Sequence, residues 1–225
     1  MTHSLDHAES PRRLVVLASG EGTNLQAIID ACASGAINGQ VVGVVCNSPS
    51  AGAIRRAQRH SIATCVVIKS PDESRQSFDA RLADTVGIFR PDWIILAGFM
   101  RLLSDAFIAR FSSPQRDVPS RIINLHPASP GELPGVKAIE RAFVEAQTGS
   151  RVRSGAMVHY VDSENVDCGP VIMSVEVPLS ANDTLDDFTA RMHRHEHELL
   201  VSALQQLCRQ PHLSEAFSTS KEPLS

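Results

Sequence analysis

Residues 122–127 place an amide and an imidazole two positions apart at the end of an apolar run. Residues i and i+2 of an extended segment face the same side, so Asn124 and His126 should project together beyond the strand end. Pro127 favours extended backbone at His126. An amide that orients a carbonyl, beside a base that moves a proton near neutral pH, suits acyl-type transfer. The alternative is an ordinary strand end and proline turn, with both side chains bonded to the loop.

The composition is that of an ordinary water-soluble protein. The 225 residues suit one domain, and 43% hydrophobic residues, 20% charged residues and a net charge of −4 lack the basic excess of a nucleic-acid binder. The five cysteines form no C-x-x-C pair, and no apolar run has the length of a signal or membrane-spanning segment. We therefore expect a cytoplasmic protein with no nucleic-acid or membrane partner. Its single domain should span residues 14–209, between flexible tails at 1–13 and 210–225.

Short β-branched runs alternate with amphipathic stretches, which predicts an α/β fold with a mostly parallel, doubly wound sheet. The expected strands are residues 14–18, 41–46, 64–68, 93–97, 122–125, 156–161 and 171–177. The expected helices are residues 23–34, 51–60, 73–89, 105–111, 136–148 and a long C-terminal helix at 184–207. Residues 112–120, with two prolines, should form an exposed loop.

The turn after the first expected strand, at residues 19–24, leads directly into a helix. Glycine at position 22 allows close backbone approach, and Thr23 and Asn24 add polar groups at a helix N-terminus, which suits a phosphate. A dinucleotide is disfavoured because Leu25 stands where the third glycine of G-x-G-x-x-G belongs. Tight strand-to-helix packing is the structural alternative.

Two other strand ends carry candidate groups, and ligands of open parallel sheets collect at this edge. Residues 97–103 combine small and apolar residues with Arg101, a composition that suits a slot for a flat, partly apolar heterocycle. They could instead begin the next buried segment. The acidic loop at 162–170 contains Asp167, which could hold an imidazolium such as that of His126, or could simply form a turn.

The long C-terminal helix has a carboxylate on its apolar stripe. Glu196 is costly to bury unless it is paired, and His193 lies one turn earlier on the same face. This pair could serve a hydroxylated or cationic ligand and its phosphate, although the helix could also simply emerge from the core there. The apolar members of the stripe are Leu185, Phe188, Met192, Leu199 and Ala203.

The same helix matches the H-x-x-E-H zinc-hydrolase signature through His193, Glu196 and His197. A catalytic zinc ion needs a third protein ligand and a supporting framework, and only a short, mostly polar tail follows the motif. Histidines on the solvated side of an amphipathic helix are commoner. We therefore expect no metal, and zinc hydrolysis remains a remote alternative.

Five motifs, in order, give the chain a family resemblance. They lie at residues 19–26, 96–101, 124–127, 158–161 and 167–170. Together they resemble the phosphoribosylglycinamide formyltransferase family, or glycinamide ribonucleotide transformylases, of the folate-dependent formyltransferase superfamily, over about 14–207. The resemblance implies a Rossmann-like formyltransferase fold. It also implies transfer of the formyl group of 10-formyltetrahydrofolate, a cosubstrate, to the amine of glycinamide ribonucleotide in purine (IMP) synthesis.

The resemblance also implies residue roles. It implies that the ribonucleotide is bound by Gly22, Thr23, Asn24, His193 and Glu196. It implies that the folate is bound by Arg75, Met100, Arg101, Leu102, Leu103, Asn124, Asp162, Ser163, Glu164, Asn165, Val166 and Asp167. The implied catalytic residues are Asn124, His126 and Asp167. In the implied mechanism Asn124 and protonated His126 stabilise the oxyanion, and Asp167 keeps His126 charged and helps to move the proton through solvent.

The chain departs from the family pattern at several places. Residues 128–135 replace the usual Ser-Leu-Leu-Pro stretch, and Met157 stands where Ser or Thr is common. Residues 112–120 resemble an insertion, and the loop ending at Asp167 is one residue longer than in many members. Other folate-dependent formyltransferases, formyltetrahydrofolate hydrolase and a noncatalytic folate or nucleotide binding module are the alternatives. A homodimer is compatible with the resemblance.

Overall fold

The computed structural model describes residues 10–112, 120–180 and 182–209. The expected tail at 210–225, most of the tail at 1–13 and the core of the expected insertion at 112–120 lie outside the described residues.

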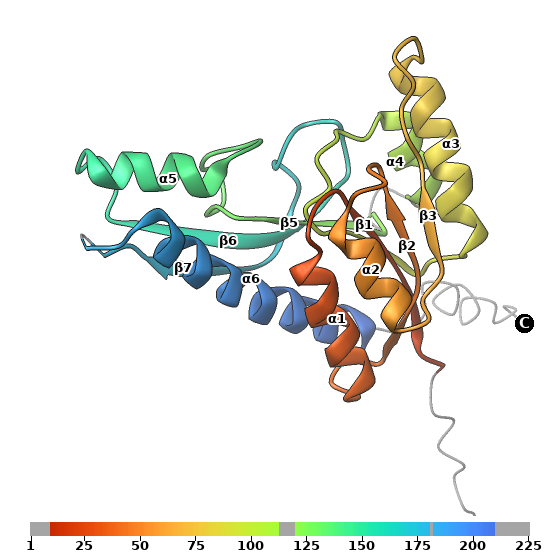
Figure 1. The fold of residues 1–225 in the computed structure, drawn as a ribbon, viewed down its shortest axis with the longest axis horizontal. Coiled ribbons are helices and arrows are strands. Elements are labelled where there is room, and N and C mark those ends of the chain that lie inside the picture. Colours follow the sequence, from red (N-terminus) through yellow and green to blue (C-terminus); the bar gives the residue numbers. More distant parts are fainter. Residues whose placement is uncertain (1–9, 113–119, 181, 210–225) are drawn as a thin grey trace, which may run out of the picture.

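A single seven-stranded sheet forms the centre of the fold (Figure 1). Its order is β3-β2-β1-β4-β5-β6-β7. The pairs among the first five strands of this order are parallel, and β6 and β7 are antiparallel to their neighbours. The strands are β1 Arg12–Ala18, β2 Gly39–Cys46, β3 Thr64–Val66, β4 Trp93–Leu96, β5 Ile122–His126, β6 Arg153–Tyr160 and β7 Val171–Pro178. The predicted mostly parallel α/β sheet is therefore confirmed, with each predicted strand present.

Helices cover both faces of the sheet, as expected of a doubly wound fold. The alternation along β1 separates two cores: Leu14 and Val16 join the core with α1 and α6, whereas Val15 and Leu17 join the core with α3 and α4. The helices are α1 Thr23–Ala33, α2 Gly52–Arg59, α3 Arg75–Ile88, α4 Asp105–Phe111, α5 Ala138–Gln147 and α6 Leu185–Cys208.

The ends of the helices follow from local capping chemistry. The hydroxyl of Ser74 accepts a hydrogen bond from the Ser77 amide, so α3 begins at Arg75, two residues later than the sequence predicted. Thr184 and Asp187 form a capping box at the start of α6. This fixes the start of the long C-terminal helix within one residue of the prediction. No helix of the described chain is both long and apolar enough to cross a membrane.

Candidate active site

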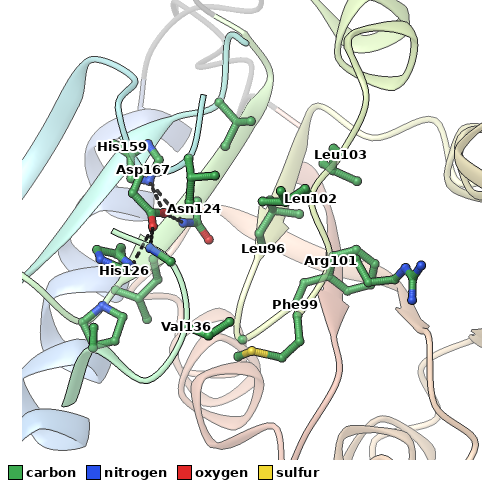
Figure 2. A pocket seen from close by; sticks show the side chains of 18 of the residues that line it. Leu96, Phe99, Arg101, Leu102, Leu103, Asn124, His126, Val136, His159 and Asp167 are labelled. Atoms are coloured by element: carbon green, nitrogen blue, oxygen red, sulfur yellow. Dashed lines mark hydrogen bonds and ion pairs between the residues drawn. The ribbon is translucent and has the colours of Figure 1, made fainter. Parts of the chain in front are cut away.

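A cavity of about 360 Å³ opens at the carboxyl ends of β1, β4 and β5, where the strand order reverses (Figure 2). Asn124, His126 and Asp167 lie on one side of it, and Leu96, Leu102 and Leu103 lie across from them. The predicted site residues that line it are Asn24, Met100, Arg101, Leu102, Leu103, Asn124, His126, Ser163, Glu164, Asn165, Val166, Asp167, His193 and Glu196. The cavity lining does not include Gly22, Thr23, Arg75 and Asp162.

The end of β5 brings the amide and the imidazole to the same side, as their spacing predicts. The amide Nδ2 of Asn124 donates to Asp167 Oδ1 at 3.0 Å, and His126 Nδ1 lies 3.2 Å from Asp167 Oδ2 (Figure 2). One carboxylate therefore contacts both side chains. The structure brings the three predicted catalytic residues together around one carboxylate.

Asp167 is held in a left-handed backbone conformation, with φ of 54°. Besides its contacts to β5, its Oδ2 accepts a hydrogen bond from the Gly135 amide at 2.8 Å. Burial by itself would raise the pKa of Asp167, but its interactions with the nearby His159 imidazole, with the Gly135 amide and with His126 lower it below its usual value. Asp167 is therefore a carboxylate at neutral pH. Its side chain is held both by β5 and by the Gly135 amide.

His126 is buried, and both of its ring nitrogens face oxygen atoms. Its Nε2 lies 3.1 Å from the carbonyl oxygen of Leu133, opposite the nitrogen that faces Asp167. Burial is the largest influence on the pKa of His126 and lowers it, and together with His159 it outweighs the raising effects of Asp167 and the Leu133 carbonyl. The role of Asp167 in keeping His126 charged during reaction stays a prediction, and each ring nitrogen faces an oxygen atom that can accept a hydrogen bond from it.

His159 is a site residue that sequence reasoning missed. Antiparallel pairing places His159 opposite Asn124, and Met157 opposite His126. The Nδ1 of His159 donates to the Tyr160 carbonyl at 2.9 Å, so in the neutral ring Nε2 is an acceptor, 3.1 Å from Asn124 Nδ2. His159 thereby orients the Asn124 amide. The sequence signals were a histidine within an otherwise apolar strand and the place of this histidine in the family motif at residues 158–161.

The start of α1 forms the polar end of the cavity. Gly22 has φ of +74°, and a Cβ at this position would lie 2.7 Å from the Cα of Ala53, so the approach of α1 to α2 requires glycine. Asn24 lines the cavity, and its buried Oδ1 has no hydrogen-bond partner within the described chain. An unpaired amide at a helix N-terminus is well placed for a polar ligand that carries an anion.

His193 and Glu196 lie on the cavity side of α6. Glu196 is only 5% exposed, and burial raises its pKa to about 7, while burial lowers the pKa of His193. His193 Nε2 and Glu196 Oε2 lie 3.8 Å apart, which is within the distance of an ion pair. Burial disfavours the charged form of both side chains, so the contact between them is weak. Among the described residues no three His, Cys, Asp or Glu side chains cluster as metal ligands, which leaves the H-x-x-E-H match without a third ligand.

The apolar end of the cavity is formed by the segment after β4. Met100 and Leu102 are 64% and 54% exposed, whereas Leu103 is buried. The guanidinium of Arg101 stacks over the Phe78 ring at 4.7 Å. Exposed apolar side chains beside a cavity suit a ligand with a flat, apolar portion. Further lining residues are Leu96, Phe99 and Val161, which lie in the family motifs, and Val136, Lys137 and Ile139, which the sequence did not single out.

The comparisons with known proteins agree with this geometry. The family model described as formyl transferase matches residues 12–204. Phosphoribosylglycinamide formyltransferase of Escherichia coli is 39% identical over 186 residues, which cover 83% of this chain and 82% of that protein. The Schizosaccharomyces pombe protein of the same name is 38% identical, over 86% of this chain and 96% of that protein.

Solved structures show the same likeness. Glycinamide ribonucleotide transformylase 1 from Symbiobacterium toebii superposes with a TM-score of 0.81 at 32% identity, over 91% of both chains. Phosphoribosylglycinamide formyltransferase from Bacillus halodurans gives a TM-score of 0.80 at 28% identity, over 88% of this chain and 96% of that chain. By family model, sequence and fold, the chain belongs to the phosphoribosylglycinamide formyltransferase family.

Proposed function

We propose that this enzyme transfers the formyl group of 10-formyltetrahydrofolate to the amine of glycinamide ribonucleotide, yielding the formylated ribonucleotide and tetrahydrofolate in purine synthesis. One observation carries the proposal: the group formed by Asn124, His126 and Asp167 lies in a cavity with a polar end at a helix N-terminus and an exposed apolar end. A phosphorylated amine and a flat folate ring need two such ends. Both substrates are small and water-soluble, so a cytoplasmic enzyme without nucleic-acid or membrane partners is part of the proposal.

The acceptor is assigned to the polar end. The phosphate would bind at the start of α1, through Gly22, Thr23 and Asn24, with His193 beside it. Glu196 would accept hydrogen bonds from ribose hydroxyls, because a buried carboxyl without a close partner gains from a donor. With this assignment the amine of the ribonucleotide would point toward Asn124, which lies between the start of α1 and the apolar end of the cavity.

The folate is assigned to the apolar end. Its ring system would contact Met100, Leu102 and Leu103 and the loop that leads to Asp167. Its formyl nitrogen would then face the end of β5. The Arg101 guanidinium, held over Phe78, supplies a positive charge for the carboxylates of the folate tail.

Transfer needs one bond to form and one to break. The acceptor nitrogen attacks the formyl carbon, and the carbonyl oxygen becomes an oxyanion that the Asn124 amide and the His126 Nε2 can stabilise as donors. In the free enzyme these donors face Asp167 and the Leu133 carbonyl, so substrate must replace those contacts. The carbon–nitrogen bond to folate then breaks, and the proton lost by the acceptor amine would pass through solvent beside Asp167 to the departing nitrogen, while ionised Asp167 stabilises positive charge on His126.

The test is an assay of the purified protein with 10-formyltetrahydrofolate and glycinamide ribonucleotide, which follows both the deformylated folate and the formylated ribonucleotide. The proposal predicts equal amounts of the two products, and neither product when the ribonucleotide is omitted. Folate deformylation without acceptor would instead indicate hydrolase activity. Binding of both substrates without turnover would indicate the noncatalytic alternative.

A further inference from the structure

Arg151 connects the loop that follows β5 to the end of α5. Its side chain is 14% exposed, and it lies two residues before β6. The Nη1 of Arg151 donates to Glu132 Oε2 at 2.5 Å, and its Nε donates to Glu145 Oε2 at 2.7 Å. Glu132 lies in the loop between β5 and α5, and Glu145 lies in α5 itself. The guanidinium therefore ties this loop to a helix that packs in the body of the fold.

Leu133, the next residue of this loop, makes the contact with His126. Its carbonyl oxygen lies 3.1 Å from His126 Nε2. Leu133 is buried and has φ of 44°, a left-handed conformation that a leucine keeps only where its surroundings impose it. Arginines hold the loop on both sides of this residue, because Arg151 pairs with the residue before it and Arg141 Nη1 donates to the Pro134 carbonyl at 2.8 Å. The position of the Leu133 carbonyl is thus set by contacts outside the loop.

The Leu133 carbonyl affects where the imidazole of His126 carries its protons. A carbonyl or carboxylate oxygen accepts hydrogen bonds and cannot donate them, so the ring that satisfies both Leu133 at Nε2 and Asp167 at Nδ1 has an N–H on each nitrogen. The titratable groups that face this ring are Asp167, which favours the protonated form, and His159, which opposes it. The loop backbone favours the protonated form as well. Nε2 is the nitrogen that the proposed mechanism uses as a donor to the oxyanion.

We propose that Arg151, through its ion pair with Glu132, is a positioning residue that holds the Leu133 carbonyl against His126 and so keeps a proton on Nε2 in the free enzyme. The arriving formyl oxygen then takes the place of this carbonyl. Glu132 and Glu145 are 44% and 40% exposed, so their ion pairs add little to stability, and the effect of Arg151 lies in position. The kinetic consequence rests on the proposed function, whereas the protonation of the ring can be measured without turnover.

The first test is the titration of the His126 ring, followed by NMR of protein with ¹⁵N-labelled histidine and assigned by its loss in His126→Ala. In Arg151→Met we expect the midpoint to move to lower pH by about 0.5 unit, because Nε2 loses its acceptor. The change of charge alone has the opposite sign, since removal of a cation favours the imidazolium and moves the midpoint to higher pH. The double variant Glu132→Gln with Arg151→Met leaves the net charge unchanged and should also titrate at lower pH.

Arg153→Met is the matched control. Arg153 lies two residues further along the chain, its side chain is 70% exposed, and it forms an ion pair with Glu176 at 3.3 Å. This variant removes the same charge and should not move the His126 midpoint to lower pH. Arg151→Lys keeps the cation but loses the fork that reaches both carboxylates, so the positioning role predicts a smaller movement to lower pH, whereas charge alone predicts none. Arg151→Lys therefore decides the question even if Arg151→Met does not fold.

The kinetic test is the pH dependence of kcat/KM for the folate donor, which reports the groups of the free enzyme. Below both midpoints Arg151→Met should match the wild type, because His126 is protonated in both proteins. Above both midpoints its kcat/KM should be ~3-fold lower, the factor that corresponds to half a pH unit. A structural defect alone would lower kcat/KM by the same factor at every pH.

A His126 midpoint that stays in place or rises in folded Arg151→Met, or in Arg151→Lys where Arg151→Met does not fold, would overturn the positioning role. A loss of kcat/KM that does not depend on pH would overturn it as well. If the wild type proved inactive as a transferase, the proposed function would fail, and the ring titration would still decide whether Arg151 holds the Leu133 carbonyl in place. A lower midpoint together with a loss of kcat/KM confined to high pH supports the inference.

Discussion

His126 lies between a carboxylate and a loop carbonyl, and its pKa is lowered by burial. We predict that His126→Ala keeps the affinity for both substrates but loses at least ~100-fold in turnover, because the proton transfer and one oxyanion donor are lost together. The measurement is steady-state kinetics with substrate affinities from calorimetry. His60→Ala, on the exposed end of α2, is the control and should behave as the wild type. Turnover within a few-fold of normal in a folded His126→Ala protein would contradict the assigned role.

Glu196 gives the fold a pH-dependent weakness. Its folded pKa of about 7 exceeds the ordinary value of 4.5, so the folded state binds the proton more tightly than the unfolded state does. Stability from this group is therefore complete below about pH 4.5 and is lost as the pH rises toward 7. We predict that Glu196→Gln is more stable than the wild type at pH 8, by on the order of 2–3 kcal/mol, and nearly equal at pH 4.5.

Urea unfolding at the two pH values measures this difference, with the exposed Glu198→Gln as control. The same Glu196→Gln change should weaken ribonucleotide binding, because it removes an acceptor from the acceptor site. An equal stability difference at both pH values would show that Glu196 does not titrate as described.

The sequence revealed those site residues whose placement is local. The two-residue spacing of Asn124 and His126 on one strand was sufficient to predict that both side chains face the same side. Asp167 was predicted as their partner because it lies in an acidic loop beyond another strand. His159 was missed because its contact with Asn124 depends on the register between β5 and β6, which no short pattern encodes. The bonds of Arg75 to two cavity-lining residues depend on loops that are far apart in sequence, so they appear only in three dimensions.

At the scale of elements, the return from the Asp167 loop into β7 depends on a close backbone approach. A Cβ on Gly169 would lie 1.8 Å from the Tyr160 carbonyl oxygen. We predict that Gly169→Ala pushes the loop away from β6, lowers stability by at least about 1–3 kcal/mol and reduces turnover ~10-fold or more, because Asp167 is displaced. Thermal unfolding and steady-state kinetics measure the two effects.

Gly87→Ala is the matched control. Gly87 lies in α3, where a Cβ meets only Arg110 Nη2 at 3.7 Å, so alanine should be neutral or stabilising there. If Gly169→Ala retained the activity and stability of Gly87→Ala, the close approach would have no role in holding the loop.

Strands and helices were predictable because their signals are periodic. β-branched runs gave the strands, and the apolar stripe with the Thr184 cap gave α6. The antiparallel direction of β6 and β7 was not predictable in the same way, because an apolar strand has the same residue pattern in either direction. Whether it pairs parallel or antiparallel depends on the neighbouring strand. That direction is what places His159 beside Asn124.

At the scale of the whole molecule, one cavity spans the reversal of strand order and joins an end suited to a phosphate with an end suited to a folate ring. The sequence indicated this general location, because alternating strands and helices predict a doubly wound sheet with its ligands at the carboxyl edge. The order of the strands itself is set by long-range pairing. The central claim is that the two ends serve one reaction, in which the formyl group passes directly from donor to acceptor.

The most direct measurement follows the formyl group itself. The enzyme would be mixed with donor carrying ¹³C in the formyl group and with glycinamide ribonucleotide in H₂¹⁸O, and the products analysed by mass spectrometry. Direct attack by the amine predicts ¹³C in the formylated ribonucleotide, with no ¹⁸O in the formyl oxygen, because water never attacks the carbon. Formate carrying both ¹³C and ¹⁸O, without labelled ribonucleotide, would contradict the account and identify water as the acceptor.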